Sequence, residues 1–488
     1  MAHLAPAAAR RKKRGRAARI RGRAAVPRRR SSHSSCGHAK GRTFVSPVRL
    51  TYNNGVNPFR PVRTSSPRRE DLDTPSGPLE GLLVLDMSRI LAGPTATQLL
   101  GDLGADVIKI ERAGVGDDTR RWGPPFVPDE TGSPTTESAY YLAANRNKRS
   151  IALDLAAPEG VEIIHRIAAK ADIAIENFKV GDAARYGVDY AALSKINPGI
   201  IFASITGYGQ TGPLASLAGY DVLAQARGGI MSVTGEPEEK GGTPEKVGVG
   251  IADIMTGMYT TVAMLAALEG RRKTGRGQAI DLSLFDCQLA WLANLGTAHL
   301  LTGKTPHRMG NGHPTIVPYN AFDAADGQFM LAVGNNRQFQ RFCEIGGEPE
   351  VAQDPRFATN AARVANREAC EAVVNRIAGT KTKAEWAAAL DPAGVPAGPI
   401  NTVAEAFAEP QAIARGARVS QPYAHSGSGT VETIGNPIKY SDTRVTYRRP
   451  PPVRGEHTHE ILGDLGYSES QIADLAERGV VELSRVPA

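Results

Sequence analysis

Short apolar runs alternate with helix-like segments along the chain from about residue 78 onward. Residues 82–86, 105–111 and 200–205 have the length and the Val, Ile and Leu content of buried strands. Between such runs, segments such as 94–103 and 158–170 repeat apolar residues three or four positions apart, which is typical of helices. Strands that alternate with helices predict an α/β fold with a parallel sheet covered on both faces. Ligands are then expected at the carboxyl ends of the strands.

The pattern changes in the last third of the chain. Residues 318–393 contain two short strand-like runs followed by helical patterns, which predicts a smaller α/β domain. The Gly- and Pro-rich segment 394–400 predicts a link back to the larger domain. We therefore expect a disordered basic tail over 1–75, the first part of a large domain over 76–317, the small domain over 318–393 and a C-terminal part over 394–488.

The basic residues are concentrated at the N-terminus. The chain has 58 Lys and Arg against 50 Asp and Glu, a net charge of +8. About 19 of the basic residues and no acidic residue precede Glu70, which leaves roughly 39 basic against 50 acidic residues in the rest. The tail is expected to be disordered. It fits an organellar transit peptide, a nucleic-acid-binding arm with no folded module behind it, or a functionless extension, and its weak amphipathic pattern favours the extension.

One carboxylate lies where a glycine-rich loop becomes an apolar helix. Asp253 follows Gly248 and Gly250 and precedes the apolar run 260–268. An aspartate at such a place is either an N-cap for its own helix or a covalent nucleophile that the neighbouring glycines leave accessible. The spacing alone leaves both interpretations open.

The sequence lacks the signatures of nucleotide and metal sites. Residues 88–94 follow the first strand without G-x-G-x-x-G, which argues against a dinucleotide site, and no Walker-type loop occurs. His457 and His459 are close in sequence but have no complete ligand set around them, so we expect no metal.

Cysteine usage and hydropathy indicate in which cellular compartment the protein is expected. The 4 cysteines are scattered without a CxxC pair, which favours a reducing compartment. The run 260–268 is about half the length of a membrane span, so no membrane is expected. We expect the protein in the cytoplasm, or in the mitochondrial matrix if the tail is a transit peptide.

A set of short motifs follows one another in an order typical of one enzyme family. The motifs are the stretch 248–259 around Asp253, Leu85-Asp86 with Ala92-Gly93-Pro94, the run 107–112, the run 147–151 and Glu176-Asn177-Phe178. Together they resemble the class III CoA-transferases over about residues 78–481. In that family the aspartate that matches Asp253 is the nucleophile.

The resemblance implies a fold and a reaction. Family members have a Rossmann-like large domain built from both ends of the chain plus a smaller domain, and two chains interlock as a homodimer. They move CoA between carboxylic acids, with an acyl-CoA thioester as substrate and no permanently bound cofactor. The matching carboxylate forms an aspartyl anhydride and then an aspartyl-CoA thioester. The helix start should keep Asp253 ionised, and Gly228, Gly229, Gly248 and Gly250 are candidate N–H donors to the oxyanion.

The resemblance also assigns residues to CoA and to a loop over the active site. CoA is polyanionic and needs cations and N–H groups on the loops after strands, although an arginine taken alone is most often a solvated surface charge. The residues that match CoA-binding positions are Leu91, Ala92, Arg112, Leu153, Asp154, Asn177, Phe178, Arg185, Tyr220 and Asp221. The family's mobile glycine loop matches Gly310, Asn311, Gly312 and His313, without the four glycines of formyl-CoA transferase. His313 either contacts the acceptor acid or caps a turn.

Tyr220 bears on the choice between two subfamilies. Acyl-CoA racemases of the same superfamily carry a histidine base immediately before the aspartate that matches Asp221. A phenol is a poor base near neutral pH, so Tyr220 argues against racemisation, which stays the alternative function.

The remaining motifs indicate the substrate class. Residues 205–213, 317–319 and 333–339 most resemble family members that act on succinate and hydroxymethylglutarate. We therefore expect short dicarboxylic acids such as succinate, glutarate or hydroxymethylglutarate. Arg89, Arg146 and Arg149 are the candidates for binding the distal carboxylate.

Overall fold

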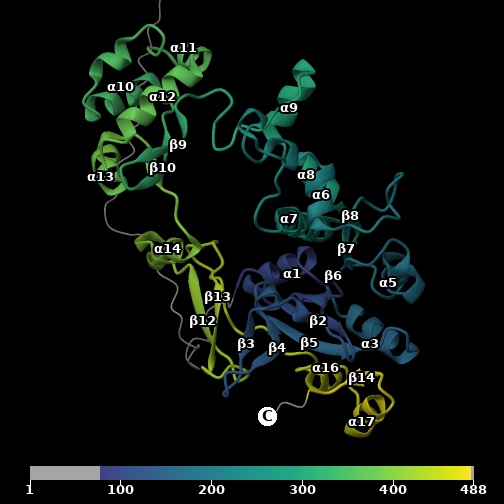
Figure 1. Cartoon of the computed structure of the whole chain (residues 1–488). Coiled ribbons are helices and arrows are strands. Elements are labelled where there is room, and N and C mark those ends of the chain that lie inside the picture. Colours follow the sequence, from purple (N-terminus) through teal and green to yellow (C-terminus); the bar gives the residue numbers. More distant parts are fainter. Residues whose placement is uncertain (1–76, 485–488) are drawn as a thin grey trace, which may run out of the picture. The chain divides into compact units, whose positions relative to one another are not determined.

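The computed structural model describes residues 77–484 (Figure 1). The predicted disordered tail of residues 1–75 lies outside the described residues. The described part is a mixed α/β fold with one large, mostly parallel sheet.

The central sheet has seven strands in the order β14-β5-β2-β1-β6-β7-β8. Neighbouring strands run parallel, except that β14 is antiparallel to β5. Without β14 the strands follow the 3-2-1-4-5-6 order of doubly wound sheets, in which ligands bind at the carboxyl ends beside the switch between β1 and β6. The strands are β1 (Leu83–Asp86), β2 (Asp106–Arg112), β5 (Lys148–Leu153), β6 (Ile173–Glu176), β7 (Ile201–Thr206), β8 (Ala279–Ser283) and β14 (Val481–Glu482).

Helices cover both faces of this sheet. Helices α1 and α7 pack on one face around Val84 and Val107, whereas α3, α5, α16 and α17 pack on the other around Leu85 and Ile108. Neighbouring strand residues serve opposite faces because successive side chains alternate in direction. These helices are α1 (Ala92–Asp102), α3 (Pro158–Ala168), α5 (Tyr190–Ile196), α7 (Ile251–Thr274), α16 (Thr458–Asp464) and α17 (Glu469–Glu477). The predicted parallel sheet covered on both faces is confirmed.

A second hydrophobic core contains buried residues from Val317 to Val395. Its sheet has the strand order β11-β10-β9, and helices α10, α12 and α13 contribute buried side chains. The ring of Trp386 stacks on that of Phe342, with 5.3 Å between centroids. These elements are β9 (Tyr319–Ala324), β10 (Gly327–Ala332), β11 (Ala397–Pro399), α10 (Asn336–Ile345), α11 (Asn360–Ala365), α12 (Arg367–Ala378) and α13 (Lys383–Ala393). The domain boundaries stay predictions.

The structure contains short elements that the apolar pattern does not predict. Residues 284–302 form two helices, α8 (Leu284–Ala290) and α9 (Ala293–Thr302), and Ala293, the first residue of α9, has a φ of 45°. The other elements without a sequence prediction are η2 (Asp118–Arg121), β3 (Phe126–Pro128), β4 (Pro134–Ser138), α2 (Ala139–Leu142), α4 (Asp182–Tyr186), α6 (Asp221–Arg227), α14 (Val403–Ala408), α15 (Pro410–Ala414), β12 (Arg418–Pro422) and β13 (Thr430–Ile434).

Helix α7 is long and apolar enough to cross a membrane by length and composition. It packs, however, against α1, β7 and β8 and buries Thr256, Gly257 and Met264 on that side. These contacts are those of a core helix.

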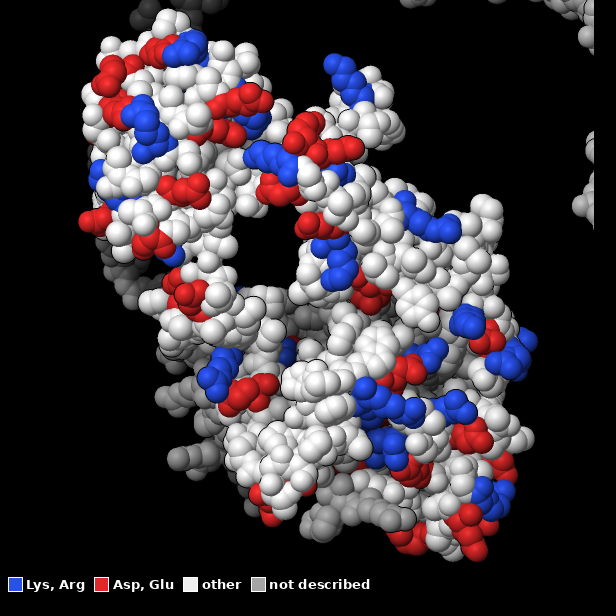
Figure 2. Space-filling model, viewed as in Figure 1, with Lys and Arg blue, Asp and Glu red and all other residues white. Residues whose placement is uncertain are grey.

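Charged side chains of both signs are mixed over the described surface that Figure 2 shows. Nucleic-acid-binding domains instead gather Lys and Arg on one face or along one stripe. The visible face of the described residues therefore gives no support to a nucleic-acid partner.

Candidate active site

Asp253 lies in the first turn of α7, three residues after the N-cap residue Gly250. The start of α1 lies close by, since a Cβ on Gly257 would come within 2.6 Å of the carbonyl oxygen of Ala92. Glycine at 257 thus lets the two helices approach. The Asp253 side chain is half-buried, and no described residue donates a hydrogen bond to its carboxylate.

The cap of α7 is the side chain of Asp221, at the start of α6. Its Oδ1 accepts hydrogen bonds from the N–H groups of Ala252 (2.7 Å) and Asp253 (3.2 Å). Its Oδ2 accepts one from Gln225 Nε2 at 2.6 Å, and Gln225 Oε1 accepts the N–H of Val247 at 2.9 Å. The N-cap interpretation of Asp253 is therefore wrong, because another carboxylate already accepts the N–H groups of that turn.

Burial, and then the nearby Asp221 carboxylate, raise the pKa of Asp253 from its ordinary value of 3.8 to about 7. The sequence predicts that the helix start favours the ionised form of Asp253, whereas the structure raises the pKa of this group. The N–H groups that would stabilise its anion are directed at Asp221 instead. Asp253 is thus a carboxylate without hydrogen-bond donors whose ionisation falls near neutral pH.

Tyr140 is a site residue that the sequence did not reveal. Burial raises the pKa of its phenol, and the negative charges of Asp253 and Asp221 raise it further, so Tyr140 lies within electrostatic reach of both carboxylates. The ring of Trp122 meets the ring of Tyr140 edge-on at 5.1 Å. Both residues come from the segment of short elements before β5, where no periodic pattern predicts structure. The run Tyr140-Tyr141 after Ser138 was the only signal there.

The predicted CoA-binding residues follow strands at one edge of the sheet. Leu91 and Ala92 come after β1, Arg112 and Leu153 are register partners at the ends of β2 and β5, and Asn177 comes after β6. The loops after β1 and β6 are joined, since the Arg89 N–H donates to Asn177 Oδ1 at 3.0 Å and Asn177 Nδ2 donates to the Arg89 carbonyl at 2.7 Å. The sheet thus brings these positions to its carboxyl edge, where the loops after β1 and β6 meet at the switch point.

Two other predicted CoA contacts are exposed. Tyr220 is 57% exposed at the start of α6. Arg185, in α4, pairs with Asp182 at 3.1 Å and lies over the ring of Tyr186, 4.6 Å from its centroid. Both side chains remain accessible to a ligand.

The loop of residues 310–313 forms hydrogen bonds with Gly235, Thr315 and Arg367. The Gly310 N–H donates to the carbonyl of Gly235 at 3.0 Å, and His313 Nδ1 accepts the N–H of Thr315 at 3.2 Å. Arg367 donates to the His313 carbonyl at 2.8 Å. No hydrogen bond of this loop within residues 77–484 reaches Asp253.

The candidate oxyanion donors are not equivalent. The Gly228 N–H donates to the carbonyl of Ala224 at 2.7 Å and so belongs to the end of α6. Gly250 adjoins the site, because a Cβ on it would lie 3.7 Å from the carboxyl carbon of Asp221. Gly248 has open space around it. The Gly228 N–H is therefore no longer a candidate donor to the oxyanion.

Two arginines predicted for the distal carboxylate already have other partners. Arg146 pairs with Asp102 through two hydrogen bonds of 2.9 and 2.6 Å, and Arg149 pairs with Asp106 at 2.5 Å as well as with Glu460 and Asp464. Both lie at or before the amino end of β5, opposite the candidate site. Arg89 remains, half-exposed and paired with Asp118 at 2.6 Å.

The histidines near the C-terminus form no metal site. His457 Nδ1 accepts the N–H of Ser150 at 3.2 Å, and His459 Nε2 contacts Glu469 at 2.8 Å. Among the described residues no group of three or more His, Cys, Asp or Glu side chains could hold a metal ion.

The chain matches the model of CoA-transferase family III over residues 79–458. The chain belongs to this family. It is an enzyme of the class III CoA-transferases, which use CoA thioesters as substrates in acyl-CoA metabolism.

Two relatives have names that specify their reactions. The succinate–glutarate CoA-transferase of Agrobacterium fabrum is 46% identical over 81% of this chain and 97% of its own length. The succinyl-CoA:glutarate CoA-transferase of Homo sapiens is 42% identical over 83% of this chain and 90% of its own length. A CaiB/BaiF family crystal structure from Brucella suis, 47% identical, superposes with a TM-score of 0.72 over 80% of this chain and 100% of that chain.

Proposed function

We propose that this enzyme transfers CoA between short dicarboxylic acids such as succinate and glutarate, with Asp253 as covalent nucleophile. The observation that carries the proposal is the Asp253 carboxylate, which is half-buried, accepts no hydrogen bond from residues 77–484 and has a pKa raised to about 7. The relatives named for succinate and glutarate support the substrate class.

The reaction proceeds by acyl and CoA exchange at one carboxylate. Asp253 attacks the carbonyl carbon of the acyl-CoA, the C–S bond breaks, and CoA leaves as a thiolate, which gives an acyl-aspartyl anhydride. The thiolate attacks the aspartyl carbonyl and releases the donor acid, which leaves an aspartyl-CoA thioester. The acceptor carboxylate attacks this thioester, the C–S bond breaks, and an acceptor–aspartyl anhydride forms as CoA thiolate leaves. The thiolate then attacks the acceptor's carbonyl carbon, which gives the new acyl-CoA and releases the Asp253 carboxylate. Two acids have exchanged CoA, and Asp253 is regenerated.

The surroundings of Asp253 suit each step. A carboxylate of raised pKa is more basic than an ordinary aspartate and therefore a stronger nucleophile once ionised. Each addition creates an oxyanion, for which the N–H groups of Gly248 and Gly250 are the proposed donors. The Tyr140 phenol, whose pKa is raised partly by the Asp253 charge, is a further proposed donor to the oxyanion.

The substrates are proposed to lie along the carboxyl edge of the sheet. The residues proposed to hold CoA are Leu91, Ala92, Arg112, Leu153, Asp154, Asn177, Phe178, Arg185 and Tyr220, together with Asp221 as the cap of α7. Arg89 is the proposed partner of the distal carboxylate, because an exposed guanidinium can exchange Asp118 for a substrate. The loop 310–313 is proposed to cover the acceptor.

The test is to incubate the full chain with succinyl-CoA and a panel of acids, then to identify new CoA thioesters by mass spectrometry. Glutaryl-CoA formation that depends on both substrates supports the proposal. Transfer only to monocarboxylic acids would contradict the substrate class.

We propose a homodimer because described helices expose apolar side chains. In α9, Leu300 and Leu301 are 85% and 80% exposed, and Val262 of α7 is 61% exposed. Exposed apolar surface of this extent marks an interaction site, and a second copy is the partner that the family provides.

The first prediction concerns this dimer. Light scattering should give about twice the chain mass of 51.8 kDa. The double variant Leu300→Ser/Leu301→Ser should raise the dimer dissociation constant at least tenfold, since each buried leucine contributes about 1.5–3 kcal/mol. Val180→Ser, at an exposed position outside this set, is the control. A monomer at all concentrations would contradict the proposal.

A second prediction separates this function from racemisation. A racemase needs a base beside the α-carbon, and Tyr220 supplies only an exposed phenol. A chiral 2-methylacyl-CoA incubated with the enzyme in deuterated water should therefore keep its α-proton. Deuterium uptake at a rate comparable to CoA transfer would show racemase activity instead.

A further inference from the structure

The loop between β1 and α1 holds a strained residue beside the candidate site. Ile90 has a φ of 71°, the left-handed region that β-branched residues rarely adopt. Such a conformation persists only where the surroundings determine it, and it is most frequent at functional sites.

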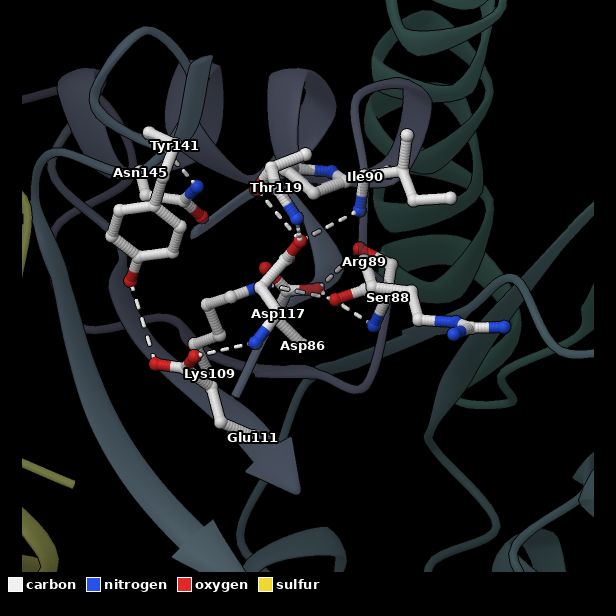
Figure 3. A network of polar contacts seen from close by, with 12 residues as sticks. Asp86, Ser88, Arg89, Ile90, Lys109, Glu111, Asp117, Thr119, Tyr141 and Asn145 are labelled. Atoms are coloured by element: carbon white, nitrogen blue, oxygen red, sulfur yellow. Dashed lines mark hydrogen bonds and ion pairs between the residues drawn. The ribbon is translucent and has the colours of Figure 1, made fainter. Parts of the chain in front are cut away.

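Side chains from other segments hold the main chain of this loop, and Figure 3 shows Lys109 and Asp117 among them. Lys109 Nζ donates to the Ser88 carbonyl at 2.9 Å, and Asn177 holds both polar groups of Arg89. The strained residue itself donates its N–H to Asp117 Oδ1 at 3.2 Å. Asp117 is thus the side chain that contacts Ile90.

Asp117 is itself fixed from several sides. Its Oδ1 accepts hydrogen bonds from the Thr119 N–H at 3.0 Å and from Thr119 Oγ1 at 2.7 Å. Its Oδ2 pairs with Lys109 Nζ at 2.9 Å, with both side chains fully buried. Its own N–H donates to Glu111 Oε2 at 2.9 Å. A carboxylate held in this way defines where the Ile90 N–H must lie.

The next residues of the loop touch the helix of the nucleophile. A Cβ on Gly250 would lie 3.2 Å from Leu91 Cδ2, and the carbonyl oxygen of Ala92 adjoins Gly257. Leu91 and Ala92 are also proposed to contact CoA. The direction of the chain at Ile90 therefore sets the position of residues that meet both CoA and α7.

The buried charged side chains under this loop are not explained by a contribution to stability. Lys109, Lys148 and Asp86 are all fully buried, and Lys148 Nζ donates to Asp86 Oδ2 at 3.1 Å. Burying ions costs desolvation free energy that apolar residues of similar size would avoid, so such pairs contribute little net stability. What they provide here is a fixed set of acceptors and donors under the loop.

We propose that Asp117 is a positioning residue, which holds Ile90 in its left-handed conformation and thereby places Leu91 and Ala92 for CoA. This inference rests on the proposed function, because it assumes that the edge of the sheet at β1 binds CoA.

The test variant is Asp117→Asn in the full chain. Its amide oxygen should turn to Lys109, because the amide NH₂ group would otherwise face an ammonium. The NH₂ group then faces the Ile90 N–H, and the hydrogen bond is lost. The Kd for CoA by calorimetry and the KM for succinyl-CoA should both rise at least tenfold, with kcat changed less than threefold.

Two further variants separate positioning from folding. Asp102→Asn weakens another buried ion pair, with Arg146 at the opposite edge, and should lower the Tm without changing the Kd for CoA. Ile90→Gly added to Asp117→Asn should restore part of the affinity, because glycine adopts a positive φ without strain.

The outcomes are distinct. A folded Asp117→Asn enzyme with a Kd within twofold of wild type would overturn the positioning role while leaving the transfer function intact. If this variant does not fold, Thr119→Val decides, since it removes one hydrogen bond to Asp117 and no charge. A threefold or larger rise in its Kd supports the inference, and an unchanged Kd overturns it. A wild-type enzyme that does not bind CoA would overturn the proposed function and this inference with it.

Discussion

Asp253→Asn is expected to abolish CoA transfer and, at the same time, to stabilise the protein above pH 7. An amide is not a usable nucleophile, so kcat should fall by about a thousandfold or more. The stability gain follows from the pKa. The carboxyl titrates near 3.8 in the unfolded chain and near 7 in the folded enzyme. Between these values the folded state binds the extra proton, and stability falls as pH rises; above 7 the full difference is lost.

The free energy of unfolding that is lost as Asp253 ionises has an upper bound of about 4 kcal/mol, from about 1.4 kcal/mol per pKa unit. Because the side chain is only half-buried and solvent screens its charge, we expect about 1–2 kcal/mol in practice. The neutral amide avoids this loss, so the Tm at pH 8 should rise by a few degrees. The helix keeps its cap, since Asp221 accepts the N–H groups of that turn.

Asp286→Asn is the matched control, because Asp286 occupies the same first-turn position of α8 but is exposed. It should leave kcat unchanged and slightly lower the Tm, since it removes a favourable charge from a helix start.

Hydroxylamine added during turnover should convert Asp253 of the wild-type enzyme to its hydroxamate. Trapping at another carboxylate, or an Asp253→Asn enzyme with substantial activity and a lower Tm, would contradict the assignment.

The large sheet could be predicted from sequence because its strands are buried on both faces. Runs such as residues 105–111 are then almost continuously apolar, and the helices between them keep a clear period. The segment before β5 could not be predicted in this way. Its elements are short, and Arg120 and Glu137 are polar residues that the pattern assigns to the surface although they are buried against each other.

The nucleophile could be located from its motif, but its environment could not. The carboxylate that caps α7 comes from Asp221, 32 residues earlier in the chain. Local spacing therefore suggested that Asp253 caps its own helix. The ion pairs of Arg146 and Arg149 could not be predicted for the same reason, because their partners Asp102 and Asp106 lie 44 and 43 positions away in the chain. Pairings of this range depend on the sheet order, which a single sequence does not state.

The second large effect is on pH dependence. If the Asp253 anion is the nucleophile, kcat/KM should decrease about tenfold per unit below pH 7, to roughly 1% of its maximum at pH 5. Burial is the larger cause of the raised pKa, and the Asp221 charge is the second. Asp221→Asn removes that charge but keeps an amide oxygen that can accept the N–H groups of Ala252 and Asp253.

The midpoint of the acid limb should therefore move to lower pH in Asp221→Asn, because the anion of Asp253 no longer faces a like charge. We expect a shift of less than about one unit, since burial is unchanged. Steady-state rates with succinyl-CoA and glutarate between pH 5 and 8.5 measure it in both enzymes. Titrations of the substrates are common to the two profiles, so the difference between the midpoints belongs to the protein. Gln225→Glu tests the opposite change, because it adds a carboxylate next to Asp221. This variant should move the midpoint of the acid limb to higher pH. An acid limb that moves upward in Asp221→Asn, or a rate independent of pH over this range, would show that Asp253 does not attack as the anion.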